Sequence, residues 1–562
     1  MITSSVKDIN GIPTLIINDE VVAPNAYITY FIENARYDDF TEAGYNIFSV
    51  PIYFATRGIQ EMNEIPPFAP GIFEKEEPDY SIADRTFRQI IDACPNAYIF
   101  PRVNVTLPLR WEQENEQELC DRGNLSQEKR RPCFSSDAWA EETKKYLGMF
   151  IDHIEKAPYR DHIFGYQIAT GNSEEWFSFD LVGSVGKRSR EKFQQRVIAE
   201  QLEGTEGEYY RFLAQMTAER VCEMARFVKE KTNHRLVVGS FYGYSFECPH
   251  KYSCHAALHK VLHCDSIDFL CSPVSYMLSR EAGYDHPYML PLDSLKKHGK
   301  LYFSENDTRT HLSKPLFDIP HFHNENYRPR PRWLAIENMK QHYARALINA
   351  HAFWWFDMGG GWYHYSPYME LAADCMKLTK ASMGKDMGGA SEIAVLVDEN
   401  VFPFVHDRDS YKAMNTCYHI RKALGLIGTP YASYLAEDYP EIKDAYKAFI
   451  LLVPQMSPMM QRIMEEEPDA LVITAANADI TTDELRQFCR EKGVHLYSNK
   501  DAVIYANQSY LFLHTASNGK AELSLPAGKR LKQTYGDAVD IENTVLPKHT
   551  GFLFEIIPEH AT

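Results

Sequence analysis

The sequence lacks several features that would assign it to particular protein classes. Met1–Lys7 opens no apolar signal segment, and no run of about 18 apolar residues occurs, so we expect neither export nor a membrane span. An excess of basic residues is also absent, since the net charge is −18. Nucleic acids and anionic membranes attract positive surfaces, so we expect neither as a partner. These absences predict a cytoplasmic protein.

Cysteine motifs are absent as well. The eleven cysteines are scattered and odd in number, which indicates reduced thiols rather than a disulfide framework. Cys248, Cys254, Cys264 and Cys271 lie near several histidines, but their spacings are not those of a zinc site. No G-x-G-x-x-G follows a strand-like run, so a nucleotide role has no support. We therefore expect no metal and no organic cofactor.

Strand-like and helix-like segments alternate through the first two thirds of the 562-residue chain. Eight such units with nearly continuous apolar strands predict an α/β fold of the (β/α)₈ (TIM barrel) type. The segment before Ala26 is the weak point of the count, because it contains apolar runs of its own. The eight runs are Ala26–Phe31, Tyr45–Ile52, Ala97–Asn104, Ile163–Ala169, Arg235–Tyr242, Ile267–Ser272, Lys300–Glu305 and His351–Phe356.

The pattern changes near residue 389, so we place the catalytic barrel at residues 1–388. Residues 389–500 contain four strand-like runs separated by helical stretches, which predicts a compact doubly wound, flavodoxin-like domain. From about residue 501 the chain has only strand and turn patterns. Residues 501–562 are therefore expected to form a small all-β domain.

Two segments carry carboxylates at the ends of predicted barrel strands. Glu174 and Glu175 follow the fourth strand, and Glu305 ends the seventh. Functional groups of such barrels gather at the carboxyl ends of the strands. Retaining glycoside hydrolysis needs two carboxyl groups about 5 to 5.5 Å apart, one as nucleophile and one as acid and base. The positions predict Glu305 as the nucleophile and Glu175, or Glu174, as the acid.

Neighbouring residues would adjust these carboxylates. The nucleophile must be ionised, and Arg102 at the end of the third strand is the first candidate to favour that state, with Arg309 the second. The acid must keep its proton, which an aromatic wall such as Trp176 would promote by desolvation. Asn172 lies just upstream of the acidic pair and is assigned to substrate binding.

Aromatic residues after the later strands predict a surface that stacks on sugar rings. Trp354 and Trp355 point to opposite faces of a strand, so one packs in the barrel and the other is available to substrate. We assign the second role to Trp355, together with Trp362 on a glycine-rich loop. Tyr242 and Tyr276 follow the fifth and sixth strands and would add hydrogen bonds.

On these segments the chain resembles glycoside hydrolases of the large (β/α)₈ clan with glutamates after strands four and seven, and more closely the family 42 β-galactosidases. The order of barrel, doubly wound domain and small β domain is similar over essentially the whole chain. The resemblance implies Glu305 as nucleophile, Glu174 or Glu175 as acid/base, and a homotrimer formed through the middle domain. One departure is Ser-Glu-Glu-Trp at residues 173–176, where that family usually has Asn-Glu.

The sequence thus predicts a retaining exo-β-glycosidase that acts on an oligosaccharide or glycoside, with β-galactosidase first. A β-mannosidase or another β-glycosidase of a sister family is an alternative. A catalytically inactive sugar-binding barrel is another, since a fold does not imply an activity. A metal-dependent barrel hydrolase is a third, but histidines do not gather at the predicted strand ends.

Overall fold

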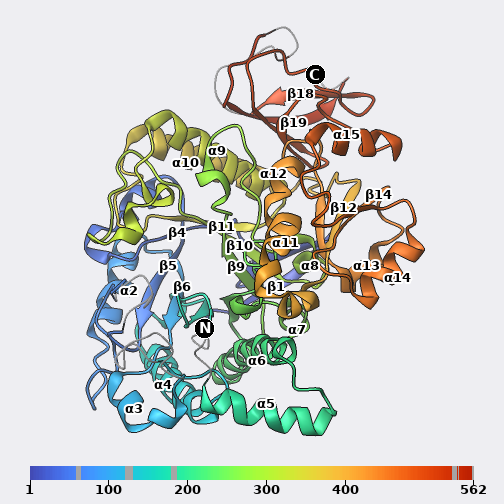
Figure 1. The fold of residues 1–562 in the computed structure, drawn as a ribbon. Helices are drawn as coiled ribbons and strands as arrows, with labels where there is room; N and C mark the ends of the chain where they lie inside the picture. The colour runs from blue at the N-terminus through green and yellow to red at the C-terminus, as the bar shows by residue number, and fades with distance from the viewer. Residues whose placement is uncertain are drawn as a thin grey trace.

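The computed structural model describes residues 1–57, 65–66, 68–120, 131–178, 186–534, 541 and 544–559. Its largest part is a closed barrel of eight parallel strands (Figure 1). The predicted order of barrel, doubly wound domain and β domain is confirmed. The barrel strands are β4 (Asn25–Ile28), β5 (Ile47–Tyr53), β6 (Tyr98–Asn104), β7 (Gly165–Ala169), β8 (Val237–Phe241), β9 (Phe269–Pro273), β10 (Leu301–Asn306) and β11 (Ala352–Phe356).

Helices follow the barrel strands and cover their outer faces (Figure 1). Both faces of each strand are therefore buried, which explains why the strands are mostly apolar. The longest helix, α6, begins with a capping box between Thr205 and Glu208. The helices are α1 (Tyr37–Glu42), α2 (Ser81–Ala93), α3 (Leu109–Glu114), α4 (Asp137–Lys156), α5 (Lys187–Glu200), α6 (Glu206–Lys231), α7 (Leu258–Leu262), α8 (Leu292–Lys297), α9 (Arg332–Ile348) and α10 (Ser366–Ser382).

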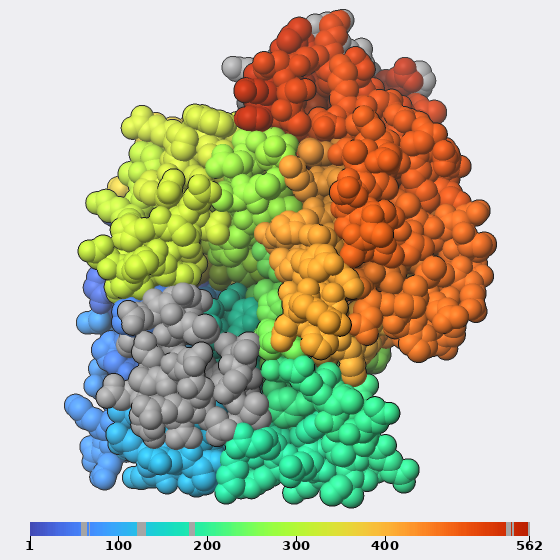
Figure 2. Space-filling view, viewed as in Figure 1, coloured from blue at the N-terminus to red at the C-terminus, as the bar shows by residue number. Residues whose placement is uncertain are grey.

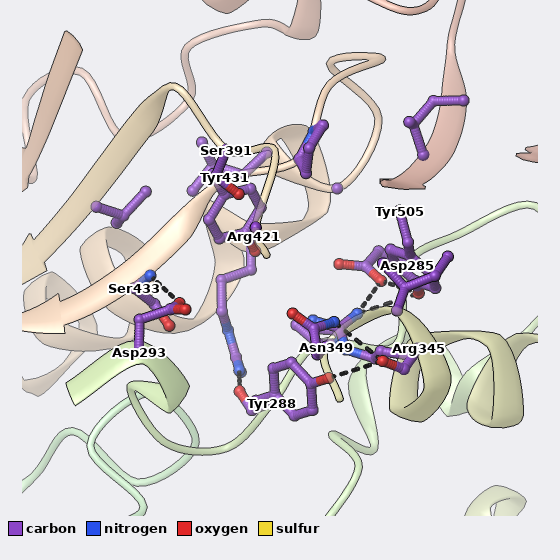
Figure 3. Close-up of a pocket in the computed structure, with 18 of the residues that line it drawn as sticks. Asp285, Tyr288, Asp293, Arg345, Asn349, Ser391, Arg421, Tyr431, Ser433 and Tyr505 are labelled. Atoms are coloured by element: carbon purple, nitrogen blue, oxygen red, sulfur yellow. Dashed lines mark hydrogen bonds and ion pairs between the residues drawn. The ribbon is translucent and has the colours of Figure 1, made fainter. Parts of the chain in front are cut away.

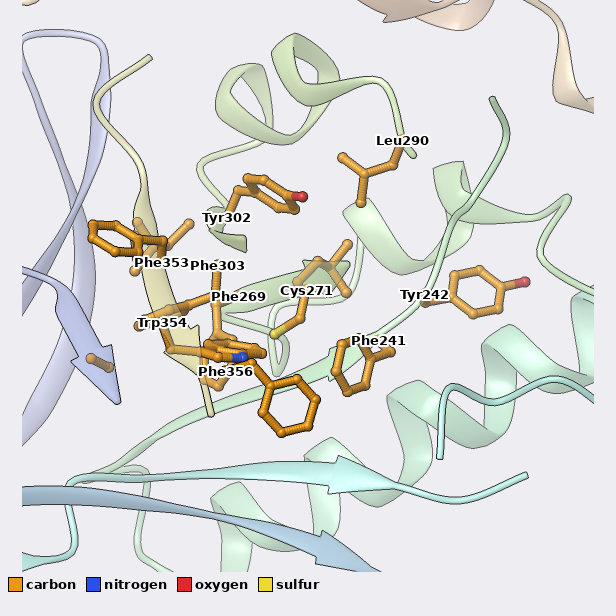
Figure 4. Packing of buried hydrophobic residues seen from close by; sticks show 14 of the residues in the cluster. Phe241, Tyr242, Phe269, Cys271, Leu290, Tyr302, Phe303, Phe353, Trp354 and Phe356 are labelled. Carbon is orange, nitrogen blue, oxygen red and sulfur yellow. The ribbon is translucent and has the colours of Figure 1, made fainter. Parts of the chain in front are cut away.

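Large aromatic rings fill the barrel interior (Figure 4). The ring of Phe303 lies 5.2 Å from that of Phe269 and 5.6 Å from that of Trp354. Gly239 pairs with Phe269 in the sheet, and a Cβ at Gly239 would lie 2.2 Å from the Phe269 ring. A small residue on one strand thus makes room for a large one on the next, as close packing requires. This packed interior forms the floor below the carboxyl ends of the strands.

The segment before the barrel forms its own antiparallel sheet of β1 (Ser4–Ile9), β2 (Ile12–Ile17) and β3 (Glu20–Val21). Its first strand lies at the amino ends of β7 and β8, where the Ser4 amide donates to the carbonyl of Arg235. The apolar runs in this segment therefore do not enter the barrel. The count that makes β7 the fourth strand and β10 the seventh is confirmed.

The next part is a parallel sheet in the order β13-β12-β14-β15, which is the doubly wound arrangement. Its strands are β12 (Ile393–Val397), β13 (Ala432–Leu435), β14 (Ala448–Leu452) and β15 (Leu471–Ile473). The helical stretch expected after β12 is interrupted by a π-helical turn, Met414–His419, between two short helices. The helices are α11 (Ser410–Ala413), α12 (Arg421–Leu424), α13 (Tyr439–Ile442), α14 (Pro458–Glu466) and α15 (Thr482–Glu491).

The last sheet is antiparallel, in the order β16-β17-β19-β18, and lies at the top of Figure 1. The Gly551 amide of this sheet donates to the carboxylate of Glu337 on α9, at 2.6 Å, so the sheet is fastened to the barrel's helical layer. Among the described residues, no helix is long and apolar enough to cross a membrane. The strands are β16 (Ala502–Ala506), β17 (Tyr510–Thr515), β18 (Lys529–Gln533) and β19 (Gly551–Pro558).

Candidate active site

A tight turn after β7 presents the acidic pair. The Trp176 amide donates to the carbonyl of Thr170 at 2.8 Å, and the Asn172 amide donates to the carbonyl of Phe177 at 3.0 Å. Ser173, Glu174 and Trp176 all have positive φ, near +60° to +66°. Left-handed backbone at residues other than glycine costs about 1–3 kcal/mol each and is concentrated at functional sites. The turn is therefore a strained segment that the surrounding structure holds in place.

Glu305 lies at the carboxyl end of β10 and is paired with a buried cation. Its Oε2 accepts from Arg102 Nη2 at 2.6 Å and from the indole nitrogen of Trp354 at 3.3 Å. Burial raises the pKa of Glu305 to about 7 even though Arg102 opposes the rise, and the charge of Asp307 adds to it. Glu305 is therefore a carboxylate that ionises near neutrality.

Glu175 has a hydrogen-bond donor but, within the part of the chain that the structure describes, no directly paired cation. Its Oε1 accepts from the hydroxyl of Tyr244 at 2.7 Å. Burial and the negative charge of Glu305 raise the pKa of Glu175 to about 8, against the lowering effect of the Tyr244 hydrogen bond. The two carboxyl groups are thus electrostatically coupled, and the one without a paired cation retains its proton to higher pH.

Glu174 points away from Glu175 and is completely buried. Its Oε1 accepts from Asn104 Nδ2 at 3.1 Å, and its Oε2 accepts from the hydroxyl of Tyr30 at 3.2 Å. Arg102 Nη1 lies 3.8 Å from the same Oε2, so Arg102 stands between Glu174 and Glu305. Burial raises the pKa of Glu174, and Arg102 is the main opposing influence.

A cavity of about 260 Å³ opens at this end of the barrel. Glu175 and Glu305 both line it, whereas Glu174 does not. Most of the remaining wall is aromatic or apolar, as is usual for small-molecule sites. The lining residues are Tyr30, Ile65, Phe68, Arg102, Ser173, Glu175, Phe177, Phe241, Tyr244, Glu247, Cys248, Pro273, Tyr276, Met289, Glu305, His321, Phe322, Tyr327, Phe356 and Met358.

Four of the predicted site residues come together in this cavity. They are Glu305, Glu175, Arg102 and Tyr276. Seven others do not line it: Glu174, Asn172, Trp176, Tyr242, Arg309, Trp355 and Trp362.

The tryptophan pair of β11 has the opposite orientation to the one we assigned. Trp354 pairs with Glu305 in the sheet register and directs its indole nitrogen to that carboxylate. Trp355 lies on the other face, where its indole nitrogen donates to the hydroxyl of Tyr45 at 2.8 Å. Side chains alternate along a strand, so only one of the two can face the barrel axis. Trp354 is the one that faces the barrel axis, because it pairs with Glu305 in the strand register.

Trp176 and Tyr242 are packing residues in this structure. Trp176 is completely buried, and its indole nitrogen donates to the carbonyl of Ile168 at 3.0 Å. The hydroxyl of Tyr242 donates to backbone carbonyls of α6 and of Cys254. Neither ring is among the residues that line the cavity. The expected desolvation of Glu175 comes instead from the wall as a whole.

Arg309 and Trp362 belong to a charged cluster that follows the carboxyl ends of β10 and β11. The guanidinium of Arg309 stacks 4.5 Å from the Trp362 ring and lies 3.4 Å from Asp307. Asp307 also pairs with Arg280 and accepts from the hydroxyl of Tyr276 at 2.8 Å. Burial by itself would raise the pKa of Asp307, but the two arginines hold it below its usual value. Asp307 is therefore an ionised carboxylate, and its hydrogen bond holds the hydroxyl of Tyr276 in place.

Sequence reasoning missed Tyr30 and Asn104 as partners of the carboxylates. Asn104 is the last residue of β6, and Tyr30 lies two residues after β4. Polar residues at those strand ends must share one end of a barrel, which is the signal that would have found them. Among the described residues, no group of three or more His, Cys, Asp or Glu side chains is arranged to hold a metal ion.

Several solved structures that share this fold are glycosidases. A β-galactosidase from the psychrophilic Marinomonas ef1 matches with a TM-score of 0.63 and 11% identity over 94% of this chain and 99% of that one. The chain shares the fold of these enzymes. A β-galactosidase from the haloarchaeon Halorubrum lacusprofundi also matches (TM-score 0.63, 11% identity, 94% and 98% of the chains). So does a GH42 exo-carrageenase from Bacteroides ovatus (0.54, 11%, 99% and 85%). No protein-family model and no curated protein sequence matches the chain.

Proposed function

We propose that this protein is a retaining exo-β-glycosidase, with a β-galactoside as its first expected substrate. The observation that carries the proposal is the pair of carboxylates in one cavity with different surroundings. Glu305 is bonded to Arg102, whereas the described partner of the Glu175 carboxyl is the hydroxyl of Tyr244. This chemistry requires one ionised and one protonated carboxyl group. Different surroundings provide this by separating the two pKa values.

Each step has a residue suited to it. Ionised Glu305 attacks the anomeric carbon while Glu175 gives its proton to the leaving oxygen, so the glycosidic bond breaks as the glycosyl-enzyme bond forms. Glu175, now a carboxylate, then takes a proton from water, which attacks the same carbon and releases Glu305. The Tyr244 hydroxyl stabilises Glu175 in its ionised form between the two steps. Arg102 stabilises Glu305 as the carboxylate that leaves the anomeric carbon in the second step.

The size of the cavity favours action on a terminal sugar. At about 260 Å³ it is below the range of about 300–1,000 Å³ typical of sites for larger ligands. One sugar ring therefore fills it, with the aromatic rings of the wall against the C–H faces of the sugar. Galactose is proposed first because similar folds include β-galactosidases; a β-mannoside or another β-glycoside is the alternative.

Azide rescue tests the two roles separately. Initial rates on a panel of nitrophenyl β- and α-glycosides would be compared for wild type, Glu305→Gly and Glu175→Gly, with and without azide. We expect one β-glycoside to be turned over, an inverted glycosyl azide from Glu305→Gly, and a retained one from Glu175→Gly. Glu174→Gly is the matched control and should give no azide product.

Two outcomes would contradict the proposal. An inverted hydrolysis product from wild type, followed by proton NMR, would exclude the retaining mechanism. No turnover of any glycoside, combined with sugar binding that survives Glu305→Gln, would instead support the inactive sugar-binding barrel.

We also propose a homotrimer and a cytoplasmic location, both of which come from the resemblance or the sequence. Light scattering after size-exclusion chromatography tests the first, since a trimer of the 64.8 kDa chain differs clearly from a monomer or dimer. Fractionation of the source cells tests the second.

A further inference from the structure

The loop that follows β8 carries two residues of the candidate active site. Residues 243–248, here called the β8 loop, include Tyr244, whose hydroxyl donates to Glu175, and Glu247, which lines the cavity. Gly243 begins the loop with a φ of +91°, and a Cβ there would lie 2.6 Å from the Leu258 side chain. Only glycine can therefore occupy position 243 with this backbone conformation.

The barrel holds one part of the loop through a neutral histidine. His255 Nδ1 accepts from the amides of Gly243 and Tyr244 at 3.1 and 3.3 Å. Burial lowers the pKa of His255 to about 3, so the ring remains an acceptor at neutral pH. Its ring stacks 4.4 Å from that of Phe177, which follows the acidic pair. The barrel also holds the backbone farther along the loop, because the amides of Phe246 and Glu247 both donate to the carbonyl of Met289, at 3.0 and 3.3 Å.

The doubly wound domain contacts two side chains of this loop. Arg421 of α12 donates to Glu247 Oε2 at 2.8 Å, and Glu399, just after β12, accepts from the Ser245 hydroxyl at 3.2 Å. Arg421 and Glu399 are only 3% and 1% exposed. The other Glu247 oxygen accepts from the Tyr276 amide at 3.2 Å, so the contact with Arg421 continues to a second cavity residue.

Arg421 is itself fixed in direction. Its Nη1 donates to the carbonyl of Tyr288 at 2.6 Å, and its Nε donates to that of Tyr418 at 3.2 Å. Figure 3 shows Arg421 extending past the polar cavity between the domains to reach Tyr288. In Figure 2 the light-orange segment near residue 410 lies against the green barrel loops, beside a hollow in this face. The domain is therefore placed to act on the rim of the site.

Packing alone does not explain why these two polar side chains are buried. Burying a carboxylate or a guanidinium costs several kcal/mol, and apolar residues of similar size usually stabilise an interface as well or better. Both side chains reach across from the doubly wound domain and contact side chains of the same six-residue loop. A positioning function accounts for their burial.

We propose that the doubly wound domain is part of the catalytic apparatus, with Arg421 and Glu399 as positioning residues that hold the β8 loop and thereby Tyr244 against Glu175. This inference rests on the proposed glycosidase function. It assigns the middle domain a contribution to the site within a single chain. Oligomerisation is not needed for it.

Substitution of Arg421 tests the proposal. In Arg421→Met the loop loses its ion pair, and we expect kcat to fall about ten- to hundredfold, as for small misplacements of a catalytic group. Arg421→Lys keeps a donor and should recover part of the loss. Arg486→Met is the matched control: Arg486 is also buried, binds Asp483 and Asp501, and does not contact the loop.

The pH profile separates positioning from general destabilisation. The Tyr244 hydroxyl favours the ionised form of Glu175, so losing that bond raises the pKa of Glu175 and moves the basic limb of kcat/KM to higher pH. Arg421→Met and Tyr244→Phe should move the limb in the same direction. Arg486→Met should lower the melting temperature and leave the limb where it is.

Hydrogen–deuterium exchange gives a readout that does not depend on activity. Amides of residues 243–248 should exchange faster in Arg421→Met than in wild type or Arg486→Met. Unchanged exchange in Arg421→Met, or faster exchange with an unmoved basic limb, would overturn the proposal. A wild type inactive on every glycoside, with the exchange difference present, would instead refute the glycosidase function while the contact of the domain with the loop stands.

Discussion

The barrel and the doubly wound domain place similar acidic pairs in similar positions and use them differently. In the barrel, Glu174 and Glu175 follow β7. In the other sheet, Glu399 follows β12 and Asp438 follows β13, each beside a second acidic residue. All are near the carboxyl ends of parallel strands, where ligands of α/β proteins bind.

The difference lies in what covers the strand ends. Glu175 lines an open cavity, and none of the described Lys, Arg or His side chains pairs with it directly. Glu399 and Asp438 are covered by the barrel: Glu399 holds the β8 loop, and Asp438 accepts from Ser294 and contacts His298 at 2.8 Å. Residues of the other domain thus engage Glu399 and Asp438, whereas Glu175 lines the cavity.

The largest effect expected is at the nucleophile. Glu305→Gln keeps the shape of the side chain but cannot form the covalent intermediate, so kcat should fall on the order of 10⁴-fold or more. Steady-state rates on the best nitrophenyl glycoside measure the loss. A loss of less than tenfold, with an unchanged melting temperature, would show that Glu305 is a structural carboxylate like Asp438.

The acidic pair itself comes next. Glu175→Gln removes the proton donor and should reduce kcat by about 10²–10⁴-fold on substrates with poor leaving groups, and less on activated ones. Glu174→Gln keeps hydrogen bonding to Asn104 and Tyr30 and should cost about tenfold or less on both kinds, comparable to one hydrogen bond. Comparing the two leaving groups for each variant measures this. A reversed order would assign the acid to Glu174.

The pH dependence should reflect the two environments. Glu305 must be ionised and Glu175 protonated, so kcat/KM should rise through an acid limb near pH 7 and fall through a basic limb near pH 8. Because the two groups are coupled, the limbs belong to the pair. Rates from pH 5 to 10 give the profile. Activity that keeps rising above pH 9 would contradict Glu175 as the acid.

The tryptophans of β11 provide a matched pair within one strand. Trp354→Phe removes a hydrogen bond to Glu305, and we expect kcat to fall about tenfold, as for one lost hydrogen bond to a charged group. Trp355→Phe removes the bond to Tyr45 and should change the melting temperature with little effect on kcat. Equal effects on both quantities in the two variants would mean that neither ring acts on the nucleophile.

The smallest effect on catalysis is expected at Asp438. Asp438→Asn weakens charged hydrogen bonds at the domain interface and should lower stability by about 2 kcal/mol. It should leave kcat/KM within about twofold of wild type, because Asp438 contacts neither the cavity nor the β8 loop. Urea unfolding and initial rates measure the two quantities. A large loss of activity would show that the interface as a whole, rather than Arg421 and Glu399, supports the site.

Much of the fold follows from local sequence patterns. Strands such as Ala352–Phe356 are apolar on both faces, and helical stretches separate them, so the order of elements could be counted. The N-terminal hairpin shows the limit of this approach. Its apolar runs have the length and composition of barrel strands, and only their antiparallel pairing separates them from the barrel.

The site could be predicted only in part, for a geometric reason. Strand ends are fixed by the fold, so Arg102 and Glu305 were found from their positions. The side-chain direction beyond a strand end depends on the local turn. The positive φ values of Ser173, Glu174 and Trp176 direct Glu175 into the cavity and Trp176 into the core, and no periodic pattern in the sequence encodes that turn.

The sequence alone thus determined the succession of strands and helices and the strands that carry the carboxylates, because both depend on local patterns of apolar residues. The tertiary structure alone decided which glutamate of the pair faces the cavity and which tryptophan faces Glu305. It also decided that Arg421, far along the chain, supports the rim of the site. These facts depend on turn conformation, strand register and the packing of one domain on another, which arise only when distant segments meet.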